Sequence, residues 1–324
     1  IVTWVDMRGG MRDIYAQRID SDGNRVWEYN GVAVCIWPEH QYDPELCADG
    51  YGGAIVAWKD FRDALSVIYA QRITSGGSAA WTTGGVPLTS SASGQRNPKL
   101  VSDGQGGAIV TWDRIVVTDY NIYAQRIGYD GIVAWSSGGE AICTEAQNQL
   151  SPRIMSDSSG GAIIAWTDYR SGVYADVYAQ RIDYYGNTIW SANGVAVATG
   201  QGDQADPELA SDGVDGAIIT WRDNRSGLND IYAQNIDGSG AARWAAGGVI
   251  VCNAGGDQES PFILCDGSGG AYIAWNDERG GDIDIYAQRI ERNGYWGYPS
   301  PEIAGARDVP GDQGGYVNLS LIHI

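Results

Sequence analysis

The chain has 324 residues and a formal net charge of −19, with 46 glycines, 19 tyrosines, 13 tryptophans and two phenylalanines. This acidity argues against nucleic acid as a partner, because a phosphate backbone is bound by a basic stripe, and it argues equally against anionic membrane surfaces. No apolar run approaches the roughly 18 residues of a membrane span and no window keeps a helical period, so short strands joined by tight turns are expected.

The dominant feature is a unit of about 54 residues that occurs six times. Its signature is Trp-x-Asp-x-Arg, then Asp-Ile-Tyr-Ala-Gln-Arg-Ile, a glycine turn and a second tryptophan. A period of this size indicates a solenoid, a propeller or a tandem array. We therefore expect features that recur in every unit to be architectural, and features that occur once to be where function lies. The paired tryptophans are Trp4 and Trp27, Trp58 and Trp81, Trp112 and Trp135, Trp166 and Trp190, Trp221 and Trp244, and Trp275 and Trp296.

Residues 44–97 show the elements of one unit in chain order. The second strand, apolar on both faces, must be covered on both sides, as in stacked sheets. This pattern predicts an all-β fold, a β-propeller of about six four-stranded blades built on the 54-residue repeat. A parallel β-helix is the alternative, and the glycine hairpin turns between the strands argue against it. The four strands of the unit are expected at 44–47, 54–58, 67–73 and 81–88.

The Trp-x-Asp-x-Arg element supplies the main candidate site. In a propeller, the loop after the second strand opens on the same face as the connections between blades. A ring of carboxylates and guanidiniums there is suited to a polar ligand, and a belt of Asp–Arg pairs that lock each loop to its neighbour is the structural alternative. The third unit is one residue short, with Asp113 directly before Arg114. The candidate ligand-binding residues are Asp6, Arg8, Asp60, Arg62, Asp168, Arg170, Asp223, Arg225, Asp277 and Arg279.

The Asp-Gly-x-Gly-Gly turns raise the question of calcium, and we expect no metal there. Each turn supplies one carboxylate, whereas calcium takes about six to eight oxygen ligands. An aspartate that caps its own turn is the expected role. The recurrent glutamines of Tyr-Ala-Gln-Arg and Gln-x-x-Pro are expected to bridge backbone groups. The turn aspartates are Asp49, Asp103, Asp157, Asp212 and Asp266.

No catalytic constellation is apparent in the sequence. Apart from His323 near the end of the chain, His40 is the only histidine. A serine triad or a multi-histidine metal site would therefore depend on His40 alone. The segment Trp37-Pro38-Glu39-His40 departs from the repeat, and Trp37 is the one tryptophan outside it. We expect Trp37, Glu39 and His40 either to form a stacking site for a sugar or peptide or to be an insertion packed on the surface.

The five cysteines do not form a metal-binding or disulfide pattern. Cys35, Cys143 and Cys252 occupy the same position of the repeat, and no Cys-x-x-Cys pair occurs. A zinc knuckle and a full disulfide framework are therefore not indicated. Small buried apolar side chains are the expected role. Bridges from Cys35 to Cys47 and from Cys252 to Cys265 stay open as alternatives.

The order Pro-x-Leu, Asp-Gly-x-Gly, Ala-Ile-Val-Ala-Trp-x-Asp-x-Arg, Ile-Tyr and Gly-x-x-x-Trp resembles the blade pattern of the sialidase-like propeller superfamily over residues 1 to about 304. The family's Asp-box turn, Ser-x-Asp-x-Gly-x-Thr-Trp, is not met, and the arginines are uniform across blades. The chain is more similar to repeat regions of large secreted or surface-anchored bacterial proteins. That resemblance implies an extracellular or cell-surface location.

The expected division of the chain has three parts. Residues 1–304 form the propeller, whose first blade is truncated because Ile1 to Trp4 aligns with Ile55 to Trp58. Residues 305–318 are similar to the start of an Ig-like or fibronectin-type-III-like module, here truncated. Residues 319–324 resemble the translation of a transposon end used in sequencing libraries, so we expect an adapter artefact.

Together these observations predict a non-catalytic extracellular binding or spacer propeller that recognises a glycan or a protein on the Asp/Arg-loop face. No catalytic residue, metal or cofactor is expected, and neither nucleic-acid binding nor membrane insertion. The propeller is expected to be a monomeric domain of a larger chain. The alternative function is that of a sialidase-like glycoside hydrolase or a polysaccharide lyase.

Overall fold

The structure is a computed structural model that describes residues 1–89, 93–296, 302–308 and 317–322. Within these ranges every regular element is a β-strand. No helix of the described residues has the length and hydrophobicity that a membrane span requires. The prediction of an all-β fold is confirmed. The module expected at 305–318 and the artefact expected at 319–324 lie partly outside the described residues.

The described strands form six sheets and a separate hairpin. The first sheet has no strand equivalent to the innermost strand of the others, so β1 (Val2–Asp6) corresponds to their second strand, and the sixth has none equivalent to the outermost. We call the sheets blades 1 to 6. Blade 1 contains β1 (Val2–Asp6), β2 (Asp13–Gln17) and β3 (Val32–Cys35). Blade 2 contains β4 (Gln41–Ala48), β5 (Ala54–Asp60), β6 (Val67–Ile73) and β7 (Val86–Pro87). Blade 3 contains β8 (Gln95–Ser102), β9 (Ala108–Val116), β10 (Asp119–Ile127) and β11 (Glu140–Cys143).

The remaining sheets repeat the same order. Blade 4 contains β12 (Gln149–Ser156), β13 (Ala162–Asp168), β14 (Asp176–Ile182) and β15 (Val195–Ala198). Blade 5 contains β16 (Gln204–Ser211), β17 (Ala217–Asp223), β18 (Asp230–Ile236) and β19 (Val249–Cys252). Blade 6 contains β20 (Gln258–Cys265), β21 (Ala271–Asp277) and β22 (Asp284–Ile290). The hairpin contains β23 (Glu302–Asp308) and β24 (Val317–Ile322).

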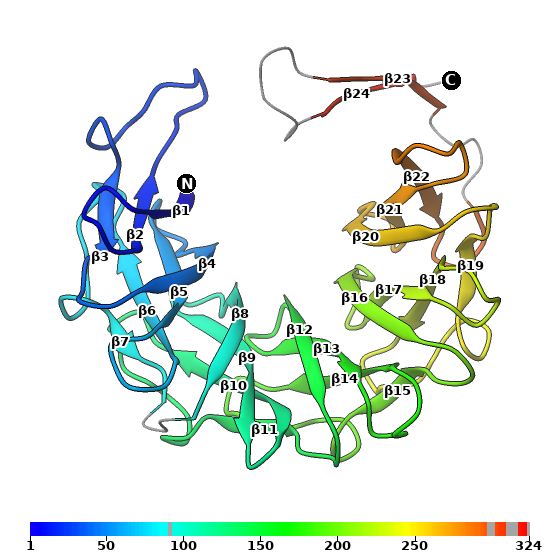
Figure 1. The fold of residues 1–324 in the computed structure, drawn as a ribbon, viewed down its shortest axis with the longest axis horizontal. Coiled ribbons are helices and arrows are strands. Elements are labelled where there is room, and N and C mark those ends of the chain that lie inside the picture. Colours follow the sequence, from blue (N-terminus) through cyan, green and yellow to red (C-terminus); the bar gives the residue numbers. More distant parts are fainter. Residues whose placement is uncertain (90–92, 297–301, 309–316, 323–324) are drawn as a thin grey trace.

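The blades follow one another along an open arc, with blade 1 and blade 6 at its two ends (Figure 1). The inner strands β4, β8, β12, β16 and β20 contact one another in succession, and β3, β7, β11, β15 and β19 lie on the outside. All neighbouring strands within a blade are antiparallel. This is the blade arrangement of a β-propeller.

The antiparallel order gives the molecule two different faces. The loops between second and third strands and the connections between blades lie at one end of the strands, which we call the loop face. The turns between first and second strands and between third and fourth strands lie at the other end, which we call the turn face. Sites on the two faces are therefore separated by the length of a strand.

The core lies between successive blades, and the repeat tryptophans build it. Trp58 is fully buried and packs with Ile14 and Val34 of the preceding blade. Full burial of such a side chain removes about 150–250 Å² from water. In the first five units the second tryptophan hydrogen-bonds to the next blade, as Trp27 Nε1 does to the carbonyl of Ser75 (3.0 Å). In the sixth unit, Trp296 Nε1 donates instead to the carbonyl of Ile250 in the preceding blade. The tryptophans therefore join blades, as the repeat predicts.

The recurrent glutamines bridge backbone groups, as expected. Gln71 Nε2 donates to the carbonyl of Thr82 (2.9 Å), while its Oε1 accepts from the backbone N–H groups of Arg72 (3.0 Å) and Trp81 (2.9 Å). The same contacts recur at Gln125 and Gln180. A side-chain amide thereby satisfies donors and acceptors where the strand ladder is interrupted.

Candidate functional site

The Trp-x-Asp-x-Arg element folds into a bend in which the Trp and Arg side chains hydrogen-bond to the Asp between them; we call this arrangement the corner. In blade 2, Asp60 Oδ2 accepts from Trp58 Nε1 (2.8 Å) and from Arg62 Nη2 (2.6 Å). Its Oδ1 accepts from the backbone N–H and from Nε of Arg62, both at 2.9 Å. The carboxylate is fully buried. Such charge-assisted, forked pairs are strong and geometrically specific.

The same corner occurs in blades 1, 4, 5 and 6. Burial by itself raises the pKa of Asp277, but hydrogen bonds from Arg279 and Trp275 outweigh it and lower the pKa to about 2. Hydrogen bonds from Arg8 and Trp4 likewise hold the pKa of Asp6 well below its usual range. The carboxylates of Asp6 and Asp277 are therefore ionised at neutral pH.

The structure places both members of each predicted Asp–Arg pair within one blade. Contact with the preceding blade is made by the guanidinium, since Arg62 Nη2 donates to Cys35 Sγ (3.3 Å). Arg170 reaches Cys143 and Arg279 reaches Cys252 in the same way. Burial raises the pKa of the Cys35 and Cys143 thiols to about 12, so these thiols stay protonated. All five cysteines are free, so neither of the two bridges left open is formed.

The aspartates of the turn face cap their own turns, as predicted. Asp49 Oδ1 accepts from the backbone N–H groups of Tyr51 and Gly53, both at 2.8 Å. Its Oδ2 accepts from Arg72, the arginine of Tyr-Ala-Gln-Arg. The sequence analysis did not assign this arginine a partner. The recurrence of Arg at one position and Asp at another, 23 residues earlier, was the available signal.

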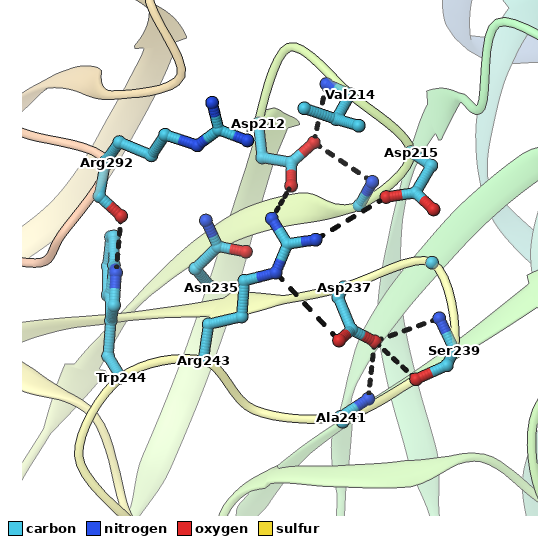
Figure 2. A network of polar contacts seen from close by, with 12 residues as sticks. Asp212, Val214, Asp215, Asn235, Asp237, Ser239, Ala241, Arg243, Trp244 and Arg292 are labelled. Carbon is cyan, nitrogen blue, oxygen red and sulfur yellow. Dashed lines mark hydrogen bonds and ion pairs between the residues drawn. The ribbon is translucent and has the colours of Figure 1, made fainter.

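Blade 5 departs from this scheme, as Figure 2 shows. Asn235 replaces the arginine, and Arg243 from the neighbouring turn binds Asp212 Oδ2 instead (2.9 Å). Arg243 also lies 3.7 Å from Asp215 and 3.9 Å from Asp237. Among the described residues, no group of His, Cys, Asp and Glu side chains is arranged to hold a metal ion. The acidic groups of this blade are therefore an arginine-binding network.

A pocket of about 430 Å³ opens on the loop face of blade 2, beside the connection from blade 1. Glu39 and His40 come from the connection between the blades, and Arg62 and Asp63 come from the loop after β5. Apolar surface comes from an aromatic pair, Tyr42 and Phe61, with ring centroids 5.6 Å apart. The remaining lining residue is Ala64. Three of the residues predicted from the sequence, Glu39, His40 and Arg62, therefore share one pocket.

Glu39 has an unusual backbone conformation at the edge of this pocket. Its φ of 74° lies in the left-handed region, which favours glycine. The equivalent residues of later connections are Gln147 (φ 66°), Gly202 (φ 80°) and Gly256 (φ 85°). The carbonyl of Glu39 accepts from Gln41 Nε2 (3.1 Å), which fixes this conformation. The left-handed conformation therefore belongs to the repeat, and the glutamate side chain is what distinguishes this connection from the later ones.

His40 fastens two blades together. Its Nδ1 accepts from the backbone N–H of Arg12 (3.2 Å), so the neutral imidazole carries its proton on Nε2. Asn148, Asp203 and Asp257 take the same place in later connections, and each accepts from the backbone near the start of the preceding blade's third strand. His40 is thus a unique residue type in a recurrent structural position.

Trp37 packs on the next blade while 40% of its surface stays exposed. The Arg62 guanidinium lies 4.8 Å from the centre of the Trp37 ring. A Cβ added to Gly84 would come within 2.7 Å of the ring, so only glycine fits beneath it. Trp37 is not a lining residue of the pocket, but it contacts Arg62, which is one.

Asp13 is a buried carboxyl group that was not predicted as a candidate from the sequence. Asp13 faces Asp6 across the β1–β2 pair. Burial raises the pKa of Asp13, and the neighbouring Asp6 carboxylate raises it further. A signal was present, because this first position of Asp-Ile-Tyr is Val67 in blade 2 and Asn121 in blade 3.

Comparison with solved structures places the chain among β-propellers. A protein of unknown function from Dyadobacter fermentans matches with a TM-score of 0.52 and 12% identity over 81% of this chain and 82% of its own. An α-L-arabinanase of Penicillium chrysogenum, solved with arabinobiose, matches with a TM-score of 0.47 and 13% identity over 99% and 94%. The microbial sialidase Hz136 matches with a TM-score of 0.48 and 12% identity over 88% and 65%. No protein-family model and no curated sequence matches the chain.

These comparisons correct one expectation. The sequence predicted a non-catalytic binding or spacer propeller, and this prediction is corrected: the solved structures similar to the chain that carry an activity in their names include an arabinanase and a sialidase. The uniform repeat suggested a purely structural domain because it offered no catalytic cluster. A propeller fold can carry its active residues on a few loops while the blades themselves stay uniform.

Proposed function

We propose that this chain is a six-bladed propeller that hydrolyses glycosidic bonds in the pocket of blade 2 beside the connection from blade 1, in a secreted or surface-attached protein. The observation that carries the proposal is the pocket itself. It collects Glu39, a residue in a glycine-type conformation, with a second carboxylate, Asp63, and an aromatic pair. The extracellular location is supported by the resemblance to secreted repeat regions.

The two carboxylates match the minimum set for this chemistry. Most glycoside hydrolases use a pair of Asp or Glu residues that flank the scissile bond. One carboxyl group donates its proton to the departing oxygen. The other acts as a carboxylate, either on the sugar or on the water that replaces the leaving group. Glu39 comes from the connection before β4 and Asp63 from the loop after β5, so a sugar ring that enters the pocket meets one carboxyl group from each of two segments.

The other lining groups suit a sugar substrate. Tyr42 and Phe61 present ring surface to the apolar side of a sugar, as aromatic residues do when half exposed. Arg12 Nη1 donates to the hydroxyl of Tyr42 (2.8 Å), which orients that ring. The Arg62 guanidinium is already bound to Asp60, so it offers only its remaining donors to substrate hydroxyl groups.

The test is turnover of a glycan panel followed by single substitutions. Linear arabinan and sialyllactose are incubated with the wild-type protein, and new reducing ends or free sialic acid are measured. We expect cleavage of a panel member, lost on Glu39→Gln and on Asp63→Asn by about 100-fold or more. Glutamine fits the backbone at 39, since Gln147 adopts the same conformation at the equivalent position.

The matched control is Gln147→Ala, which alters the equivalent connection outside the pocket. This variant is expected to keep wild-type turnover. Cleavage that survives both carboxylate substitutions would show that the pocket is not the reaction site. Absence of cleavage across the panel by the folded wild-type protein would count against hydrolysis of these glycans.

A further inference from the structure

Four tyrosines gather on the turn face of blades 2 to 4, on the opposite side of the molecule from the pocket. Tyr51 is 62% exposed, Tyr129 48% and Tyr185 79%, while Tyr184 is half-buried. We call these four residues the tyrosine patch. Contiguous exposed aromatic rings on a protein indicate a binding site, whereas single exposed apolar residues do not.

The tyrosine patch does not belong to the repeat. The positions equivalent to Tyr51 are Gln105, Ser159, Val214 and Ser268. The positions equivalent to Tyr129 and Tyr184 are Ser21, Ser75, Gly238 and Arg292. The blades fold with small or polar residues at these places, so the architecture does not require the rings. The tyrosines therefore need an explanation outside the fold.

The repeat arginines hold the rings of this patch in place. The Arg72 guanidinium lies 3.9 Å from the centre of the Tyr129 ring and 5.7 Å from that of Tyr51. The Tyr51 and Tyr129 rings meet edge to face with centroids 5.2 Å apart. Arg72 is itself bound to the buried Asp49. The two rings are therefore fixed before any ligand arrives, which lowers the entropy cost of binding.

The same arrangement continues into blade 4. The Arg126 guanidinium lies 3.7 Å from the Tyr184 ring centre and donates to the Tyr184 hydroxyl group (2.7 Å). That hydroxyl donates in turn to Gln105 Oε1 (3.4 Å). Tyr185 packs edge to face on Tyr184, with centroids 5.3 Å apart. A hollow of about 300 Å³ lies beside Tyr184 and Tyr185.

The charge of the tyrosine patch is balanced. Arg72, Arg126 and Arg181 are each paired with a turn aspartate. The surface thus presents rings and hydroxyl groups without excess positive charge, which disfavours anionic ligands such as acidic polysaccharides. Flat rings with polar rims are complementary to sugar rings, which carry C–H groups on a face and hydroxyl groups at the edge.

We infer that the tyrosine patch binds a neutral polysaccharide chain, laid across the turn face of blades 2 to 4. Binding to the tyrosine patch does not depend on the pocket on the opposite face. Only the identification of the bound polymer as the substrate rests on the proposed function. A polymer held on one face and cleaved on the other keeps the enzyme on its substrate between cleavage events.

The test is affinity electrophoresis of the full chain in native gels that contain linear arabinan, barley β-glucan or polygalacturonate. All variants carry Glu39→Gln so that the gel polymer stays intact. We expect retardation by at least one neutral polymer and none by polygalacturonate. The triple variant Tyr51→Ala, Tyr129→Ala, Tyr185→Ala is expected to weaken binding about tenfold or more.

Two further variants keep the result interpretable. Tyr185→Ala alone removes the most exposed ring and leaves the arginine contacts in place, so it tests binding even if the triple variant melts early. The matched control is Tyr29→Ala, because Tyr29 is 73% exposed and stacks on Arg25 (4.0 Å) in blade 1, away from the patch. The control is expected to bind like the parent protein.

Three results would overturn the inference: no retardation of the parent by either neutral polymer, equal retardation of the parent and patch variants, or stronger retardation by polygalacturonate. A separate turnover assay tests the proposed function. The patch variants with native Glu39 are assayed on arabinotriose, which is too short to span both faces. Unchanged turnover with lost binding supports two independent sites, and lost binding without any turnover removes only the proposed function.

Discussion

The corner of blade 3 differs from that of blade 4 by one missing residue. In blade 4, Asp168 accepts from Trp166 Nε1 (2.7 Å) and from a forked Arg170 two residues later. In blade 3, Asp113 directly precedes Arg114, and the loop shrinks to a tight turn in which Val117 has a φ of 63°. Arg114 no longer reaches the carboxylate.

In blade 3 a different arginine binds the aspartate, and it bonds only one of the two carboxylate oxygens. Arg96 Nε, from the inner strand, donates to Asp113 Oδ2 (2.7 Å). Within the described residues, Asp113 Oδ1 and Trp112 Nε1 have no hydrogen-bond partner. Burial then raises the pKa of Asp113, opposite to the shift at Asp277. The difference teaches that the spacing of the Asp and Arg, not their presence, saturates the carboxylate.

The largest expected effect is on stability when a saturated carboxylate is removed. Asp168→Ala leaves the Arg170 guanidinium and the Trp166 indole N–H without their acceptor, and we expect a loss of about 4 kcal/mol in the free energy of unfolding. Asp113→Ala is expected to cost about half as much, because Arg96 can turn to solvent. Urea unfolding of both variants measures the difference. Equal losses would show that the two corners are equivalent.

Glycine substitutions test the same comparison through packing. A Cβ on Gly85 would come within 2.4 Å of the Trp58 ring, whereas on Gly139 in blade 3 the closest approach to Trp112 is 3.0 Å. Both glycines have positive φ, so both alanine variants carry backbone strain. We expect Gly85→Ala to cost about 3 kcal/mol and Gly139→Ala about 1 kcal/mol. Thermal unfolding of both variants measures the two losses. A larger loss for Gly139→Ala than for Gly85→Ala would contradict looser packing around Trp112 in blade 3.

The pH dependence of stability should have opposite signs at the two kinds of corner. Asp277, with a pKa of about 2, stabilises the fold above the ordinary Asp value of about 3.9, and this contribution is lost as pH falls through 2. Asp113 has a raised pKa, so its favourable contribution is complete below about 3.9 and is lost as pH rises through its folded value.

Asparagine variants separate the two contributions. The stability deficit of Asp277→Asn relative to wild type should shrink between pH 5 and pH 2. Over the same range, wild type should gain stability relative to Asp113→Asn. Unfolding free energies measured at several pH values provide the test, and parallel curves for the two variants would contradict the assigned shifts.

Much of the fold was predictable because its rules are local. The period of the tryptophans, the glycine turns and the apolar second strand are visible within one unit of sequence. The capping role of Asp49 was predictable for the same reason, since its partners lie within four residues.

Contacts between units were not predictable in this way. Tyr51 and Tyr129 are 78 residues apart, yet they meet because adjacent blades bring their turns together. Glu39 and Asp63 share a pocket because β4 pairs with β5, which brings the connection before β4 beside the loop after β5. A repeat shows which residues are equivalent, but it does not show which equivalent loops approach one another. Departures from the repeat could be located in the sequence, but their partners required the structure.

The central claim is that the departures from the repeat carry the function while the repeat itself carries the fold. The most direct measurement records turnover and melting temperature together for wild type, Glu39→Gln and Asp168→Asn, using the glycan that the wild-type protein cleaves. We predict that Glu39→Gln loses turnover at an unchanged melting temperature, and that Asp168→Asn melts earlier yet retains turnover while folded. Turnover by Glu39→Gln at the wild-type rate would contradict the claim.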